Sequence, residues 1–251
     1  MEFVFPWRAA SLLCGLASVL CAQPPKAKLT PVPFVGCKSD GQTGPKEAPK
    51  GNSVVVSTGR EAAEQLAYYK SAQGIGVLAP RGWHCFGVYG SGGDTLYVTS
   101  NSAGLADFFL SAKPAFTGPV IQLSRTYGDG SGRNIVAEVI ARVFPIRRAF
   151  VTRVMEIFEM PANSFPDGPH PTDKLTYRSQ NVVEFETPAH QEGLGTMAWI
   201  AKNDSPIQGV AILFGSAPNL LHARIRLPAS MRELAPAIVS QVETDAVRPG
   251  K

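Results

Sequence analysis

The spacing of hydrophobic positions switches between a helical and a strand-like period several times along the chain, and each switch marks an expected element. The clearest helix is expected over Asn134–Phe144, where the apolar residues share one stripe while Glu138 and Arg142 face away. Pro145 ends this helix. It can also open a second amphipathic helix over Ile146–Phe158, because proline suits the first helical turn.

Short apolar runs bounded by turn residues predict strands in the rest of the chain. The expected strands are Val54–Val56, Gly76–Pro80, Cys85–Tyr89, Thr95–Thr99, Pro119–Tyr127, Leu175–Thr187, Gly195–Lys202, Ile207–Gly215 and Leu220–Leu227. Strands occur in runs, and helices are segregated from them. This order predicts an α+β fold, a mainly antiparallel sheet with helices packed on it and a disulfide-linked N-terminal lead-in.

Two capping-box patterns mark the expected starts of further helices. Thr58–Glu61 precedes apolar residues at helical spacing, which predicts a helix ending near Gly74. Ser230–Glu233 has the same spacing and predicts a closing helix to about Glu243. A short helix is also expected over residues 105–109.

The first residues resemble a secretory signal. Arg8 is followed by an apolar run over Ala9–Ala22 that is too short to cross a bilayer comfortably, and prolines follow it. We therefore expect residues 1–22 to be a signal peptide and the mature chain to be periplasmic or secreted, without a stable membrane span. The alternative is a membrane tether, either an uncleaved signal or a lipid anchor.

Composition divides the remainder into a lead-in and a body. Residues 23–53 are rich in proline and glycine and are expected to be extended and pinned to the body only at Cys37. Residues 54–251 are expected to form one α+β domain, or two sub-lobes meeting near residues 160–173. The net charge is only +4. Nucleic-acid-binding proteins cluster their basic residues in one stripe, and so small a surplus does not indicate one, so no nucleic-acid partner is expected.

Cys37 and Cys85 are the only cysteines after the expected signal. Two cysteines in an oxidising compartment usually pair. A redox pair would usually read Cys-x-x-Cys, and no histidine cluster completes a zinc site. We therefore predict a Cys37–Cys85 disulfide, with no metal and no cofactor.

A glycine-rich loop over Tyr127–Arg133 is the best candidate for binding chemistry. It leads into the clearest helix, and free amides at a helix start make an anion site at Gly130, Ser131, Gly132 and Arg133. The other interpretation is a flexible turn with Ser131 or Asn134 as the N-cap. The spacing matches neither the dinucleotide nor the P-loop pattern.

Signatures of catalysis and metal binding are weak elsewhere. No serine in the chain has the paired glycines of a nucleophile elbow, so no catalytic residue is assigned. Asp167, His170 and Asp173 are close in sequence, but irregular loop spacing indicates solvated side chains. His190 and Glu192, near Glu184 and Glu186, are similarly interpreted as surface charges, and His222 is expected to be half-buried in its strand.

Two short segments resemble a known fold. Gly76–Trp83, a strand running into Pro-Arg-Gly-Trp, is similar to the opening hairpin of the PsbP-like fold of extrinsic photosystem subunits. Arg224–Leu227 followed by Ser230–Glu243 is similar to how that fold closes, but the helical segment Asn134–Phe158 has no counterpart there. Taken whole, the chain resembles a bacterial exported protein family with no assigned activity. No functional residue is therefore carried over.

These observations predict an exported envelope protein that binds a partner or a small ligand without catalysis. The alternative is a periplasmic hydrolase or another enzyme. That alternative requires the Gly128–Arg133 loop, His190 and Glu192 to meet in one deep pocket.

Overall fold

The computed structural model describes Met1, residues 29–102 and residues 116–247, and it confirms the α+β class. Within these ranges the strands form a four-stranded and an eight-stranded sheet, mostly antiparallel. The rest of the expected signal segment and the helix expected near residues 105–109 lie outside the described residues.

The smaller sheet has the strand order β3-β1-β4-β5. Its strands are β1 (Leu29–Cys37), β3 (Ser53–Ser57), β4 (Leu66–Ser71) and β5 (Val77–Pro80). β1 pairs antiparallel with β3 and parallel with β4, so this part of the expected lead-in is a central strand instead of a segment held only at Cys37. Val32, which is 1% exposed, shows that β1 contributes to the core.

The larger sheet has the order β2-β6-β7-β8-β12-β11-β10-β9. Its strands are β2 (Ser39–Gly41), β6 (His84–Gly90), β7 (Gly93–Thr99), β8 (Val120–Thr126), β9 (Lys174–Ser179), β10 (Val182–Thr187), β11 (Ile207–Phe214) and β12 (Asn219–Arg226). β2 and β6 are parallel, and the other neighbours are antiparallel. The sheet contains strands from both sides of residues 160–173, where a boundary between sub-lobes was the alternative.

The helical segments follow the expected order. They are α1 (Arg60–Gln65), α3 (Arg133–Val143), η1 (Pro145–Arg147), α4 (Arg148–Ile157), η2 (Ala229–Leu234) and α5 (Ala235–Val247). The amphipathic pair separated by Pro145 is confirmed as α3 followed by η1 and α4. On the expected stripe of α3, Val136 and Ile140 are fully buried, whereas Ile135 is 54% exposed.

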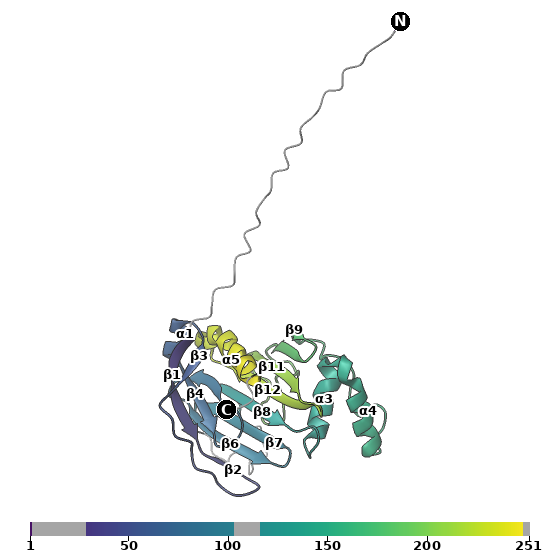
Figure 1. Cartoon of the computed structure of the whole chain (residues 1–251), viewed down its shortest axis with the longest axis horizontal. Coiled ribbons are helices and arrows are strands. Elements are labelled where there is room, and N and C mark those ends of the chain that lie inside the picture. The colour runs from purple at the N-terminus through teal and green to yellow at the C-terminus, as the bar shows by residue number, and fades with distance from the viewer. Residues whose placement is uncertain (2–28, 103–115, 248–251) are drawn as a thin grey trace.

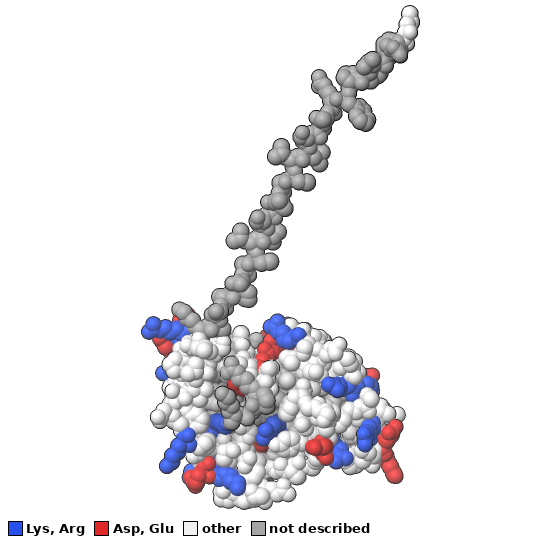
Figure 2. Space-filling view, in the orientation of Figure 1, with Lys and Arg blue, Asp and Glu red and all other residues white. Residues whose placement is uncertain are grey.

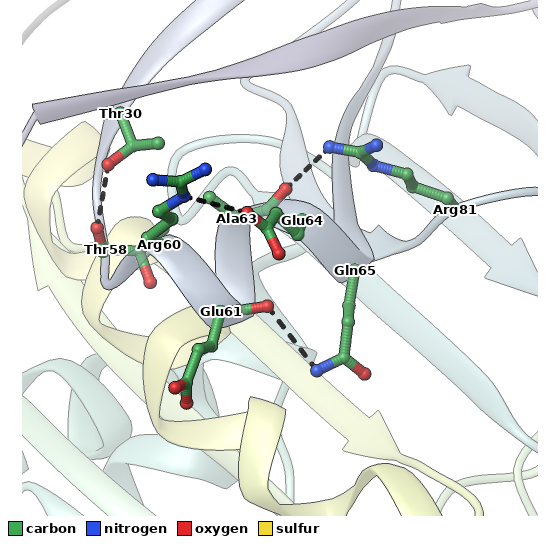
Figure 3. A network of polar contacts seen from close by, with 8 residues as sticks. All are labelled: Thr30, Thr58, Arg60, Glu61, Ala63, Glu64, Gln65 and Arg81. Atoms are coloured by element: carbon green, nitrogen blue, oxygen red, sulfur yellow. Dashed lines mark hydrogen bonds and ion pairs between the residues drawn. The ribbon is translucent and has the colours of Figure 1, made fainter.

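α1 is much shorter than the helix predicted from Thr58 to Gly74. Its N-cap is Gly59, and no side chain caps it, so the capping box does not form. The carbonyl of Thr58 instead accepts a hydrogen bond from Thr30 Oγ1 (3.1 Å) on β1 (Figure 3). Arg81 Nη2 donates to the carbonyl of Ala63 (2.8 Å), which ties the short helix to the chain that follows β5.

The chain over Leu66–Ser71 forms β4 because it is buried between β1 and β5. A strand buried on both faces reads as a continuous apolar run, which periodicity cannot distinguish from a buried helix. Two other expectations are also wrong in detail. Leu175–Thr187 is the hairpin β9–β10, and Gly195–Lys202 is a loop with only isolated bridges at Ile200.

The large sheet has different neighbours on its two faces. One face packs on the small sheet and α5 in a shared core that includes Leu78, Ile121, Ile225 and Ile238. The other face packs against α3, α4 and the loop before β11. In Figure 1, α3 and α4 lie at one end of the molecule and the small sheet at the other.

The predicted Cys37–Cys85 disulfide is confirmed, with the two Cα atoms 5.4 Å apart. Cys37 ends β1 and Cys85 lies in β6, so the bond links the small sheet to the large one. On the face drawn in Figure 2, Lys and Arg alternate with Asp and Glu and form no broad basic surface. Among the described helices, none is long and apolar enough to cross a membrane.

Candidate functional site

The central strands of the large sheet carry buried polar side chains on the face toward α3. Gln122 on β8 and Arg224 on β12 are directly opposite each other and are 2% and 9% exposed. Ser124 and His222 form the next pair along the same strands, with exposures of 8% and 1%. Buried polar groups on a sheet face are costly unless they have partners, so their hydrogen bonds are informative.

Arg224 is a buried cation held by neutral acceptors. Its Nε donates to the carbonyl of Leu194 (2.9 Å), and its Nη1 donates to Oε1 of Gln122 (2.8 Å). No described carboxylate lies within ion-pair distance of it. Burial lowers the pKa of Arg224 to about 10, so the guanidinium still carries its charge near neutral pH.

A cavity of about 470 Å³ lies over this part of the sheet, and we call it the Arg224 cavity. Its floor comes from β6, β7, β8 and β12, and its walls come from α3 and the loop before β11. The residues that line it are Val88, Thr95, Tyr97, Gln122, Ser124, Thr126, Ile135, Glu138, Val139, Arg142, His170, Gly193, Leu194, Thr196, Met197, Ala198, Trp199 and Arg224. This volume is within the range of cavities that bind small molecules.

Arg142, on α3, brings a second positive charge to the cavity. Its Nη1 donates to the carbonyl of Gly168 (3.3 Å), and its buried Nε has no hydrogen-bond partner. Glu138, one turn earlier on α3, is the carboxylate among the described lining residues. Burial, and then the charge of Arg142, lowers the pKa of His170, so this imidazole is neutral near pH 7.

Arg226 shows how a buried arginine is satisfied in this fold. Its guanidinium donates to three backbone carbonyls, at Gly118 (2.9 Å), Ala201 (2.6 Å) and Phe116 (2.7 Å). These bonds hold the loops on either side of the sheet in place. Arg226 is therefore structural, whereas Arg224 has fewer bonds and lines a cavity.

The glycine-rich loop predicted as an anion site lies elsewhere, beside the start of α3. Gly132 is the N-cap, and no side chain caps the helix, so neither Ser131 nor Asn134 has the capping role considered for it. Arg133 donates through Nε to the carbonyl of Gly130 (3.0 Å) and through Nη2 to that of Asp129 (3.0 Å). Its guanidinium thus closes the loop, which leaves less of it available for a ligand.

Gly128, Asp129 and Arg133 line a second hollow of about 550 Å³ between this loop, α4 and the β11–β12 turn. We call it the Arg153 groove because Arg153, an exposed α4 residue, also lines it. Its apolar lining is partly open to solvent, with Ile146 58% exposed. A surface arginine costs little to leave unpaired, so the groove carries less functional information than the Arg224 cavity.

The remaining candidates do not assemble into one site. His190 pairs with Asp204 (3.3 Å) and Glu192 with Lys202 (3.3 Å), and neither His190 nor Glu192 lines the Arg224 cavity or the Arg153 groove. The convergence with the glycine-rich loop that a hydrolase would need is therefore absent from these two hollows.

The cluster considered for a metal ion also separates. Asp167 pairs with Arg148, whereas Asp173 accepts hydrogen bonds from Thr187 Oγ1 (2.6 Å) and the amide of Leu194 (2.9 Å). In the described part of the chain, no group of three histidine, cysteine or carboxylate residues is placed to hold a metal.

Sequence reasoning missed Arg224 as a site residue. Alternation along β12 assigns His222, Arg224 and Arg226 to one face, which normally predicts a solvent-facing side. The available signal was the polar pair Gln122 and Ser124 at the same period in the strand expected over Pro119–Tyr127. Only the structure shows that α3 and a loop cover this face.

No family model, no curated protein and no solved structure matches this chain. Its function is therefore inferred from its own residues.

Proposed function

We propose that this chain is an exported protein that binds a small anionic ligand in the Arg224 cavity and does not chemically change it. The observation that carries the proposal is the charge of Arg224, which is buried beside a cavity without a carboxylate partner. Arg142, with an unpartnered Nε, reaches the same cavity from α3.

The physical reason is the cost of burying a charge. Removing an ion from water costs several kcal/mol, and neutral hydrogen-bond acceptors recover only part of this cost. A carboxylate or similar anion would restore the lost interaction and match the fork of the guanidinium. The buried guanidinium is thus already placed to contribute to the binding energy of an anion.

The enzyme alternative lacks an activated nucleophile in this cavity. Ser124 lies opposite His222, but its hydroxyl donates to the backbone carbonyl of His222 (3.3 Å). Both ring nitrogens of His222 are without hydrogen-bond partners, so the imidazole neither activates a hydroxyl nor is oriented by a carboxylate. Binding without reaction is the simpler function for this geometry.

Export is the second part of the proposal. The Cys37–Cys85 disulfide supports it, because such bonds persist mainly in oxidising compartments. We propose that residues 1–22 direct the chain there. Intact-mass analysis of protein from the native cells should give a mature chain with both cysteines oxidised, and a full-length chain with free thiols would contradict export.

Ligand binding is tested by thermal unfolding of the mature protein with millimolar carboxylate, sulfate or phosphate salts. At one hundred times its Kd, a ligand stabilises the folded state by about 2.7 kcal/mol. We expect at least one anion to raise Tm, and Arg224→Gln or Arg142→Gln to remove the effect. Arg153→Gln is the matched control, and loss of the effect in this variant alone would place the anion site in the Arg153 groove.

A further inference from the structure

The hydroxyl groups on the floor of the Arg224 cavity carry information about the ligand beyond its charge. Thr95, Ser124 and Thr126 line the cavity from β7 and β8, and Thr95 lies directly opposite Ser124. Gln122 precedes Ser124 by two residues, so the three polar positions of β8 point to one face. An otherwise apolar sheet here presents a row of hydrogen-bonding groups.

These hydroxyl groups are left with unused hydrogen-bonding capacity. Ser124 Oγ donates to the carbonyl of His222 (3.3 Å) and keeps its acceptor lone pairs. Neither Thr95 nor Thr126 makes a side-chain hydrogen bond with another described residue. Thr126 is only 7% exposed and lines the cavity.

The hydroxyl groups lie at increasing distance from the Arg224 guanidinium along β8. Arg224 is opposite Gln122, and Ser124 and Thr126 follow along β8 at steps of about 7 Å. A ligand whose anionic group contacts Arg224 would therefore extend past Ser124 and Thr95 toward Thr126. A ligand without hydroxyl groups would cover these side chains and leave them unpaired, which is unfavourable.

The balance of charge in the cavity suits a ligand with one negative charge. Arg224 and Arg142 contribute two positive charges, and Glu138 opposes them with one negative charge. A doubly charged anion would place its second charge beside the Glu138 carboxylate. A single carboxylate avoids this repulsion.

Building on the proposed function, we infer that the ligand is a hydroxylated monocarboxylate of the sugar-acid class, with its carboxylate on Arg224 and its hydroxyl groups on Ser124 and Thr95, the nearer part of the row. The two arginines supply attraction for any anion, and the hydroxyl row supplies the selectivity. Sites built to hydrogen-bond a ligand hydroxyl discriminate strongly against analogues that lack it.

Calorimetric titration of the mature protein with four probes tests this inference. D-glucuronate has both features, hexanoate has the same number of carbons and the charge without hydroxyl groups, glucose has hydroxyl groups without the charge, and glucose 6-phosphate has hydroxyl groups with a second charge. We expect D-glucuronate to bind at least about tenfold more tightly than each of the others.

Variants of the hydroxyl row separate selectivity from anion binding. Thr95→Val and Ser124→Ala should weaken D-glucuronate by about tenfold and leave hexanoate unchanged, because they remove only hydroxyl groups. Thr176→Val, at an exposed position of β9, is the control and should change neither affinity.

The outcomes distinguish the two proposals. Equal affinity for hexanoate and D-glucuronate, with both lost in Arg224→Gln, would overturn the sugar-acid inference and leave anion binding intact. Equal affinity for glucose and D-glucuronate, unchanged in Arg224→Gln, would overturn both. Failure of all four probes to bind would overturn the sugar-acid inference, and anion binding would fail with it if no salt raised Tm.

Discussion

Arg224 and Arg226 occupy successive inward positions of β12, yet their surroundings give them different roles. Arg226 is 1% exposed and satisfies three backbone carbonyls, so it holds two loops against the sheet. Arg224 satisfies one backbone carbonyl and the Gln122 amide oxygen, and it faces a cavity. At the scale of single residues, the buried charge of Arg224 has no carboxylate partner among the described residues. A contribution to stability does not explain why this position carries a charge.

The burial of His222 should make the free energy of unfolding depend on pH. It is 1% exposed, and burial lowers its pKa well below the ordinary value, with a smaller effect from Arg224. The unfolded chain binds a proton as pH falls through about 6.5 and the folded chain does not, so the free energy of unfolding should decrease below that pH. We expect His222→Leu to reduce this loss in urea unfolding between about pH 7 and pH 5.

The control for His222 is His84→Gln, because His84 is exposed at the start of β6. This variant should follow the wild-type pH dependence. Identical pH slopes for the wild type and His222→Leu would show that His222 is accessible to protons in the folded state, contrary to its burial.

The sequence predicted β12 as a strand but not the burial of both its faces. Leu221, Ala223 and Ile225 are buried in the core shared with the small sheet and α5. His222 was expected to be half-buried and is fully buried, since α3 and the loop before β11 cover that face. Coverage of a sheet face depends on chain segments far away in sequence, which a local period cannot report.

At the scale of elements, local signals were reliable where they agreed with tertiary packing. Pro145 separates α3 from α4 because the proline restricts the preceding helix and suits the start of the next. The Thr58–Glu61 signal failed because Leu66–Ser71 gains more from pairing with β1 and β5. The strand predicted over residues 195–202 does not form for a related reason. Trp199 and Ile200 pack onto the face of the sheet instead of pairing with one of its strands.

Glu243 on α5, which is near Glu184 of β10, should make the stability of the fold depend on pH. Burial raises the pKa of Glu243, and the nearby charge of Glu184 raises it further, against a smaller lowering effect of Arg178. Arg178 holds Glu184 by two hydrogen bonds (2.7 and 3.0 Å). The folded state therefore binds the Glu243 proton more tightly, and its stabilising effect is present at acid pH and lost as pH rises through the raised pKa.

Glu243→Gln imitates the protonated side chain and should remove this contribution. In urea unfolding, the variant should gain stability relative to the wild type as pH rises from about 4 to about 7. Glu233→Gln, at an exposed position of η2, is the control and should give no such trend. A constant difference between Glu243→Gln and the wild type over this range would contradict the raised pKa of Glu243.

At the scale of the whole molecule, two sheets and α5 share one core, and a covalent bond links the sheets. The Cys37–Cys85 disulfide closes a loop with a sequence separation of 48 residues, from the end of β1 to β6. This loop contains β3, β4 and β5, which are the rest of the small sheet, together with β2 and α1. The bond therefore restricts the unfolded chain, because the segments that form the two sheets stay linked through Cys37 and Cys85.

Removal of the disulfide should destabilise the protein by about 2–5 kcal/mol. The measurement is guanidinium unfolding of the oxidised protein and of the Cys37→Ala/Cys85→Ala variant. Thiol reagent should lower the midpoint of the wild type and leave the variant unchanged. Coincident curves for wild type and variant would mean that the bond adds nothing to the docking of the two sheets.

A crystal structure of the mature protein grown with D-glucuronate tests the role of Arg224 directly. We expect density for the ligand in the Arg224 cavity, with its carboxylate on the Arg224 guanidinium and a hydroxyl group within hydrogen-bond distance of Ser124 or Thr95. Arg224 paired with Glu138 in a cavity that holds only water would contradict this role. Ligand density confined to the Arg153 groove would contradict it as well.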